Sequence, residues 1–187
     1  MNRAFSFARQ VLAATCLAGA ALSTAATPTA VAAQEVKRTE RFKNWSVFIR
    51  SGGPTKVCFA ATTPSDTKAT SGSQDVTSAI TRDRAMLKVS TFPDQKAVNE
   101  VSIDVGYPVD PKKTSTLKIG SKTFTMFSDE ETVWSRGAED DAAIVQAFRA
   151  GAMATLTAVS IRGTEVVDEF SLLGFTDAVT SVRQNCK

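Results

Sequence analysis

The sequence predicts a mainly β fold, a β-sandwich with one internal helix and a C-terminal helix. Three observations lead to this prediction. Short segments in which apolar and polar residues alternate recur along the chain, as they do in half-buried strands. Gly-containing turns separate several of these segments. Helical periodicity occurs in only two segments, which argues against alternating β-strand and α-helix units.

Composition narrows the possible functions. The chain has 187 residues, of which 43% are hydrophobic, 22% are charged and none is His. This length suits a single domain with its own core. Without His, the chain has no Ser-His-Asp triad, no Cys-His nucleophile and no His-ligated zinc or haem. We therefore expect no metal ion or other cofactor.

Residues 1–33 have the layout of a secretory signal peptide. Arg3 and Arg9 precede an apolar stretch of small residues, Val11–Leu22, and further small residues lead to a cleavage site. The apolar stretch is shorter than the roughly 20 residues that span a bilayer. We expect removal of residues 1–33 and a single β-sandwich domain over residues 34–187 with no membrane span. The expected location is periplasmic, with attachment to the outer membrane and secretion as the alternatives.

Cleavage also changes the charge of the chain. Loss of Arg3 and Arg9 lowers the formal net charge from +3 to about +1, which gives no electrostatic reason to bind nucleic acid. We therefore expect an unknown protein or envelope component as the partner. The sequence gives no oligomeric state.

Four strands are predicted in the first half of the mature chain. The clearest is Val101–Tyr107, in which every second residue is apolar and the residues between are polar or glycine. Three further segments have the same period of two: Trp45–Ile49, Val57–Ala61 and Ala85–Phe92.

The next segments form a predicted hairpin, a short strand and a helix. Leu117–Ile119 and Thr123–Met126 flank Gly120-Ser121, and a leading glycine suits a type II′ turn. A short strand follows at Thr132–Trp134. The period then becomes helical over Glu139–Ala150, where acidic residues occupy the first turn and favour the positive end of the helix dipole.

The chain ends with a second predicted hairpin and a second helix. Thr155–Ile161 and Val166–Leu172 alternate on either side of Gly163-Thr164, which we interpret as another turn with glycine first. In Phe175–Cys186 the apolar residues recur at helical spacing, so one stripe is expected to face the core. Cys186 lies on that stripe.

Two cysteines, Cys58 and Cys186, remain after the leader and its Cys16 are removed. An even count in an oxidising compartment predicts one disulfide, and a thiol on the inward face of the last helix could reach a cysteine on a strand. The alternative is two free thiols.

Thr62–Thr81 is a polar stretch rich in Thr, Ser, Asp, Ala and Gly, and we predict a long loop there. A loop of this length is either functional or a passive connector. On the functional interpretation its polar side chains bind a partner, and deletion of Ser65–Ser78 leaves thermal stability nearly unchanged. The candidate partner-binding residues are Ser65, Asp66, Lys68, Ser73 and Asp75.

Four stretches resemble the invasion-associated locus B family of exported alphaproteobacterial proteins. They are Trp45 with the Lys56-Val57-Cys58-Phe59 strand, Asn99–Pro108, the acidic-start helix ending in Arg149-Ala150-Gly151, and Ser171–Ala178 running to Cys186. They occur in order over nearly all of the mature chain. The resemblance implies an immunoglobulin-like β-sandwich, export past the inner membrane and, in some pathogens, a role in host-cell entry. It implies no catalytic motif.

Two hypotheses about function follow. The first is a non-enzymatic exported envelope or secreted protein that acts by binding a host or envelope partner. The second is a carboxylate-based periplasmic hydrolase of envelope sugars or peptides, which needs two acidic groups about 5–10 Å apart in a cleft. Its candidate residues are Asp104, Asp129, Glu131 and Asp168. Trp45 and Trp134 could form a sugar platform, but core packing is the commoner role of such residues.

Overall fold

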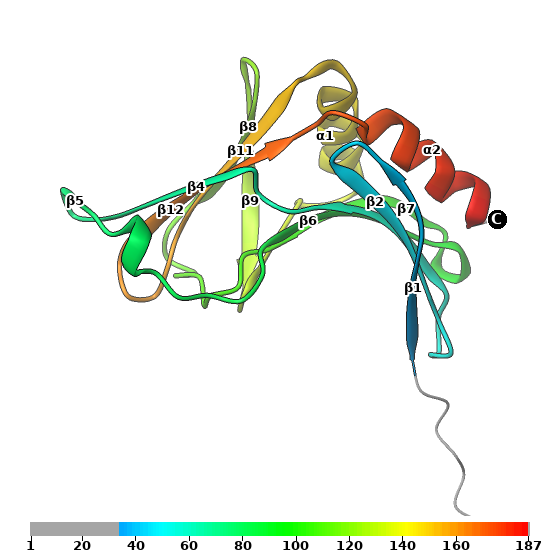
Figure 1. Ribbon diagram of the computed structural model, residues 1–187, viewed down its shortest axis with the longest axis horizontal. Helices are drawn as coiled ribbons and strands as arrows, with labels where there is room; N and C mark the ends of the chain where they lie inside the picture. Colours follow the sequence, from blue (N-terminus) through cyan, green and yellow to red (C-terminus); the bar gives the residue numbers. More distant parts are fainter. Residues whose placement is uncertain (1–33, 187) are drawn as a thin grey trace, which may run out of the picture. The chain divides into compact units, whose positions relative to one another are not determined.

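Antiparallel strands make up most of residues 34–186, the part of the chain that this computed structural model describes. The signal peptide expected at residues 1–33 lies outside the described residues. Twelve strands pair into one antiparallel sheet that is not closed, in the order β1-β2-β3-β6-β7-β10-β9-β8-β11-β12-β4-β5 (Figure 1). The mainly β class with two helices is therefore confirmed. The strands form one hydrogen-bonded sheet, and the sandwich with immunoglobulin-like topology is not shown.

The sheet has two halves that meet at β9 (Lys122–Asp129). The first half contains β1 (Glu35–Phe42), β2 (Trp45–Ser51), β3 (Val57–Thr62), β6 (Met86–Phe92), β7 (Ala97–Asp104) and β10 (Thr132–Trp134). The second half contains β8 (Ser115–Ile119), β11 (Met153–Val159), β12 (Thr164–Ser171), β4 (Asp66–Ser71) and β5 (Gln74–Asp75). The first residues of β9 pair with β8 and its last residues pair with β10, so this one strand links the halves.

Both α-helices are present where their periodicity predicts them. They are α1 (Ala138–Ala150) and α2 (Phe175–Asn185), and two short 3-10 turns, η1 (Thr77–Ala79) and η2 (Pro93–Gln95), complete the structure. Helix α1 packs chiefly on β7, and α2 packs on β2 and β3. The helices therefore cover the same half of the sheet (Figure 1).

Trp45 stands at the centre of the core beneath these helices, which confirms the packing interpretation of this residue. Its side chain is fully buried, and its ring centroid lies 4.9 Å from that of Phe175 and 6.5 Å from that of Phe148. The indole Nε1 donates a hydrogen bond to the carbonyl oxygen of Ser171 at 3.0 Å. Cys186 directly follows α2 and forms a disulfide with Cys58 in β3, with 5.8 Å between the Cα atoms.

The predicted loop over Thr62–Thr81 is wrong. Asp66–Ser71 forms strand β4, which pairs with β12 over six residue pairs, and Ala69 is fully buried. Its sequence, DTKATS, has only one apolar residue, so hydrophobic alternation could not reveal it. Deletion of Ser65–Ser78 would remove this pairing and should therefore lower thermal stability, not leave it nearly unchanged.

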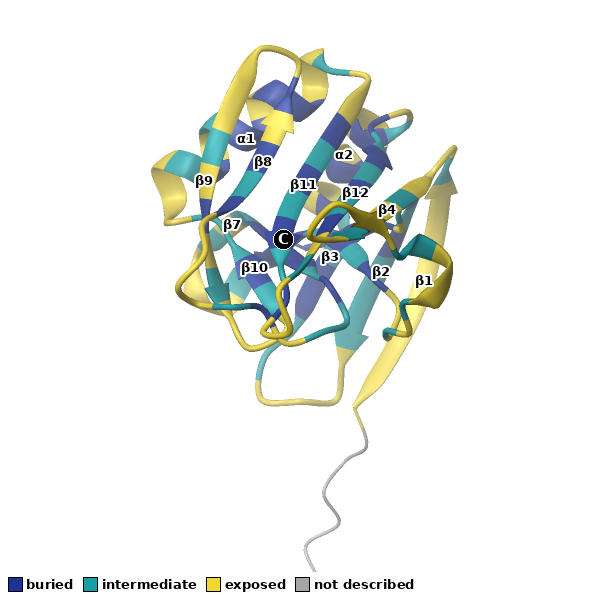
Figure 2. Cartoon of the chain, turned by 90° about the vertical axis from the view of Figure 1, so that its left-hand side faces the viewer, coloured by how far each residue is buried: buried dark blue, intermediate teal, exposed yellow. Residues whose placement is uncertain are grey.

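Strand β1 and one turn also depart from the sequence-based expectations. Strand β1 lies at the edge of the sheet and is exposed along almost its whole length (Figure 2). Because it has no buried face, its sequence does not alternate between apolar and polar residues. The turn between β11 and β12 does not begin with glycine. Ser160 donates its backbone N–H to the carbonyl of Thr164, and Gly163, with φ of 82°, ends a loop of three residues.

Candidate functional site

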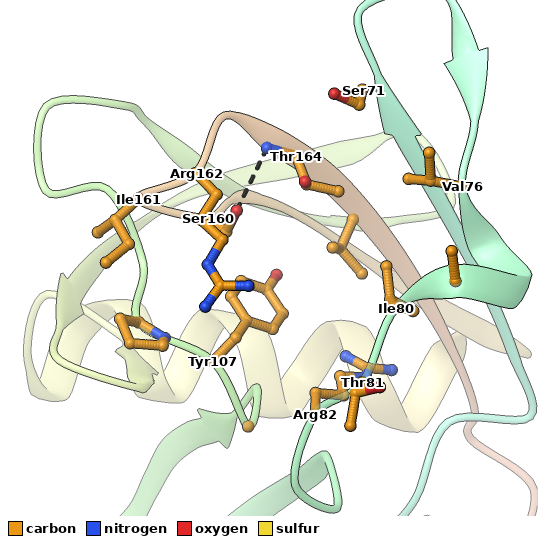
Figure 3. Close-up of a pocket in the computed structure, with 14 residues that line it drawn as sticks. Ser71, Val76, Ile80, Thr81, Arg82, Tyr107, Ser160, Ile161, Arg162 and Thr164 are labelled. Atoms are coloured by element: carbon orange, nitrogen blue, oxygen red, sulfur yellow. Dashed lines mark hydrogen bonds between the residues drawn. The ribbon is translucent and has the colours of Figure 1, made fainter.

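A hollow of about 480 Å³ lies where three segments meet, and we call it the Tyr107 hollow. One wall is the segment from Val76 to Arg82, the second is Gly106–Pro108, and the third is the β11–β12 turn with Ile161 and Arg162. Figure 3 shows Tyr107 between Ile80 and Arg82 on one side and the β11–β12 turn on the other.

Gly106 allows two of these walls to approach each other. Its φ is +75°, and a Cβ built on it would lie 2.2 Å from the carbonyl oxygen of Asp83. The backbone N–H of Asp83 donates to the carbonyl of Gly106 at 3.1 Å. Only glycine combines this backbone conformation with so close a contact, so the residue fixes Tyr107 beside the segment that carries Arg82.

Arg82, which lines the hollow, belongs to a charged cluster with Asp168 and Thr67. Asp168 in β12 is 1% exposed, and its two carboxylate oxygens accept hydrogen bonds from both terminal nitrogens of Arg82 at 2.6 and 2.7 Å. The hydroxyl of Thr67 in β4 donates to Asp168 at 2.6 Å and accepts from Arg82 at 2.9 Å. This geometry raises the pKa of Arg82, chiefly through its hydrogen bonds to Asp168. The cluster ties the segment before β6 to the opposite half of the sheet.

Tyr107 presents a neutral phenol beside this cluster. The guanidinium carbon of Arg82 lies 6.0 Å from the centroid of its ring. Burial, with a smaller contribution from the charge of Asp168, raises the pKa of Tyr107. Its hydroxyl is buried and has no hydrogen-bond partner among the described residues. The phenol therefore stays protonated and does not act as a base near neutral pH.

The Tyr107 hollow is suited to binding an amphipathic group. Ile80, Pro108, Val166 and the 61% exposed Ile161 give it apolar walls. Arg162 is exposed at the β11–β12 turn and forms no ion pair within residues 34–186. The lining contains no Asp or Glu. These walls favour an apolar group that carries a negative charge.

The structure does not bring the five candidate partner-binding residues into this hollow. Asp66 and Lys68 lie on β4, Ser65 directly precedes this strand, and Ser73 and Asp75 lie on the β4–β5 hairpin. Ser71 and Val76, from the same polar stretch, line the hollow instead.

The four candidate hydrolase carboxylates also lie outside the Tyr107 hollow lining. Asp168 is held in its ion pair with Arg82, and Asp104 accepts two hydrogen bonds from Lys88 Nζ at 2.6 and 2.8 Å. Asp129 and Glu131 are exposed at the turn between β9 and β10. The register places Asp104 and Asp129 on either side of Thr132.

Three residues of the site, Arg82, Tyr107 and Arg162, were not predicted from the sequence. Each is an isolated residue of a common type, and the segments that carry them come together only in the folded chain. The one local indication is the Gly106-Tyr107-Pro108 sequence, in which glycine and proline favour a turn after the strand.

Together these features define a mainly β protein with a disulfide and a surface hollow that has apolar walls and an arginine at its edge. A family model described as invasion associated locus B (IalB) protein matches residues 45–183. The chain therefore belongs to the IalB family. Comparisons with curated proteins and with solved structures find no match.

Residues 34–186 contain no helix long and apolar enough to cross a membrane. Within the same residues, no group of three or more Cys, Asp or Glu side chains is placed to hold a metal ion.

Proposed function

We propose that this IalB-family protein is an exported, non-enzymatic envelope or secreted protein that binds a host or envelope partner through the Tyr107 hollow. The observation that carries the proposal is the hollow itself, with apolar walls and, at its edge, Arg162, which forms no ion pair among the described residues. The Arg82–Asp168–Thr67 cluster supports it because a rigid site loses less entropy on binding. The disulfide and family membership support export.

Obstruction of the hollow tests this proposal. Ala79 is exposed and lines the hollow, so A79W places an indole within it. Ala142 is exposed on α1 away from the hollow, so A142W is the matched control. The probe is 8-anilinonaphthalene-1-sulfonate, which has an apolar ring system and one negative charge. We expect the wild-type chain and A142W to bind the probe and A79W to lose most of the binding.

The same pair of variants links the hollow to the biological partner. Crosslinking in intact cells should trap a partner on wild-type protein and A142W but not on A79W. Equal probe binding and equal crosslinking by all three chains would contradict the proposal, provided that A79W unfolds at the same temperature as the wild type.

The proposal also covers how the two halves of the sheet are arranged. We propose that the two halves of the sheet correspond to the two layers of the immunoglobulin-like sandwich implied by the family resemblance. Buried side chains from both halves join one core, among them Val47 and Leu87 from the first half and Leu156 and Phe170 from the second. An experimental structure in which the two halves do not face each other would contradict this assignment.

A further inference from the structure

A second hollow, which we call the arginine hollow, lies on the first half of the sheet. Its volume is about 270 Å³, and three guanidinium groups line it, from Arg38 and Arg41 in β1 and from Arg84 just before β6. Ser46 and Phe48 in β2 also line it. These residues lie on the face opposite to Trp45 and Val47, which pack under the helices.

A β-bulge puts both arginines of β1 on this face. Arg38 and Arg41 are three positions apart, so in a regular strand their side chains would point to opposite faces. The pairing is irregular between Arg38 and Glu40, so that Arg38 lies opposite Phe48 and Arg41 lies opposite Ser46. Phe48 and Ser46 are two positions apart and therefore share a face. The extra residue in β1 thus brings two positive charges together.

No carboxylate within residues 34–186 forms an ion pair with these arginines. The ion pairs within residues 34–186 are Arg82–Asp168, Lys88–Asp104 and Arg136–Asp140. The lining of the arginine hollow contains no Asp or Glu. Arg41 uses only its Nε, which donates to the carbonyl of Lys43 at 3.2 Å. Three guanidinium groups therefore keep free hydrogen-bond donors around one concave surface.

The rest of the lining defines the class of ligand. Ser46 and Thr63 contribute hydroxyl groups to the lining and Asn44 contributes an amide. Phe48 and Met86 contribute apolar surface. Guanidinium groups match the geometry of phosphate oxygens and bind them through paired hydrogen bonds. We propose that the arginine hollow binds a phosphate group carried on a small organic moiety such as a sugar ring or a lipid headgroup. This site is separate from the Tyr107 hollow, so the two proposals can fail independently.

The first test measures binding of glucose 6-phosphate by isothermal titration calorimetry in a low-salt buffer, with glucose as the control ligand. The variant R38Q/R41Q/R84Q removes the three charges from exposed positions. The variant K113Q/R149Q/R183Q removes three exposed charges elsewhere. We expect wild-type and control chains to bind glucose 6-phosphate but not glucose. The arginine variant should bind it at least about tenfold more weakly, because its charge-assisted hydrogen bonds to the phosphate are lost.

A second variant separates geometry from net charge. The exchange E40R/R41E keeps the composition and charge of the chain but puts a carboxylate into the arginine hollow and moves the guanidinium to the other face. We expect this exchange to weaken binding of glucose 6-phosphate as well. If it binds like the wild type, or if the control variant loses affinity as much as the arginine variant, the site is not the one proposed.

Vesicles distinguish the two sources of the phosphate. Cosedimentation with phosphatidylglycerol vesicles that is lost in R38Q/R41Q/R84Q but kept in K113Q/R149Q/R183Q would assign the site to a lipid headgroup. Binding of glucose 6-phosphate without cosedimentation would assign it to a soluble phosphorylated sugar. If the wild-type chain binds neither probe, the proposal is wrong.

Discussion

Arg82 and Asp168 form the interaction on which the geometry of the Tyr107 hollow depends. The two residues are 86 positions apart in the sequence, yet a terminal nitrogen of Arg82 lies only 2.6 Å from a carboxylate oxygen of Asp168. Asp168 is buried, and a buried charge is costly unless it has partners. Arg82 and Thr67 supply these partners through their hydrogen bonds to the carboxylate. A buried pair of this kind is costly to break from one side, because the remaining charge has no partner.

We therefore expect R82M to lower the free energy of unfolding by about 3–5 kcal/mol. Replacement of both partners, in R82M/D168L, should restore much of this loss because no buried charge remains. Urea unfolding at neutral pH measures both values, and R149M, at an exposed position of α1, is the control. A loss in R82M no larger than that in R149M would show that the pair does not support the fold.

At the scale of elements, Asp141 joins α1 to β7. Its carboxylate accepts a hydrogen bond from the backbone N–H of Val101 at 2.8 Å and another from the hydroxyl of Ser135. Burial raises the pKa of Asp141, while these two hydrogen bonds act in the opposite direction. The ionised carboxylate is therefore more costly in the folded chain than in the unfolded chain.

The raised pKa of Asp141 makes its contribution to the free energy of unfolding depend on pH. The contribution of Asp141 is fully present below its ordinary pKa of 3.8 and is lost as the pH rises through the raised folded value. We expect D141N, which keeps an oxygen acceptor for Val101 without the charge, to be at least as stable as the wild type at neutral pH. The difference should shrink as the pH is lowered and the wild-type carboxyl becomes protonated.

The matched variant D141A removes the acceptor altogether. It should lower the free energy of unfolding by about 1–3 kcal/mol, because the buried N–H of Val101 is left unsatisfied. Urea unfolding of the three chains at neutral and acidic pH checks both expectations. A D141N advantage that grows on acidification would mean that the pKa shift has the opposite sign.

At the scale of the whole molecule, the disulfide attaches the C-terminal helix to the sheet. Cys58 and Cys186 are 128 positions apart, so the bond closes a loop that contains most of the described chain. Nearby, Lys56 Nζ donates a hydrogen bond at 2.8 Å to the carbonyl of Asn185, the last residue of α2. The end of this helix is therefore fixed by one covalent bond and one charged hydrogen bond.

Removal of the disulfide should be at least as destabilising as R82M. For a loop of this size the chain-entropy relation gives a loss of about 5 kcal/mol in C58S/C186S. Chemical unfolding without reductant measures the loss. Thiol titration of the unfolded, unreduced wild-type chain should find no reactive thiol, and two reactive thiols would contradict the assignment.

The sequence identified those elements whose pattern is local. The strand from Val101 alternates because Val101 and Ile103 lie in the hydrophobic core, and α2 has an apolar stripe because one side meets the sheet. The sequence did not reveal β1 or β4, because β1 lies exposed at an edge of the sheet and β4 has a single apolar residue. Both strands are held by pairing with a neighbour, which leaves no periodic signal in their own residues.

The sequence by itself therefore determined the mainly β class, the two helices and the residue types available for binding, because periodicity and composition are properties of adjacent residues. Only the tertiary structure decided which arginines are paired and which remain free. Arg82 meets Asp168 across the two halves of the sheet, whereas Arg38 and Arg41 share a face because of a bulge in β1. Both arrangements depend on strand register, which is set by turn geometry and by the faces that become buried when strands pair, and not by the pattern within a single segment.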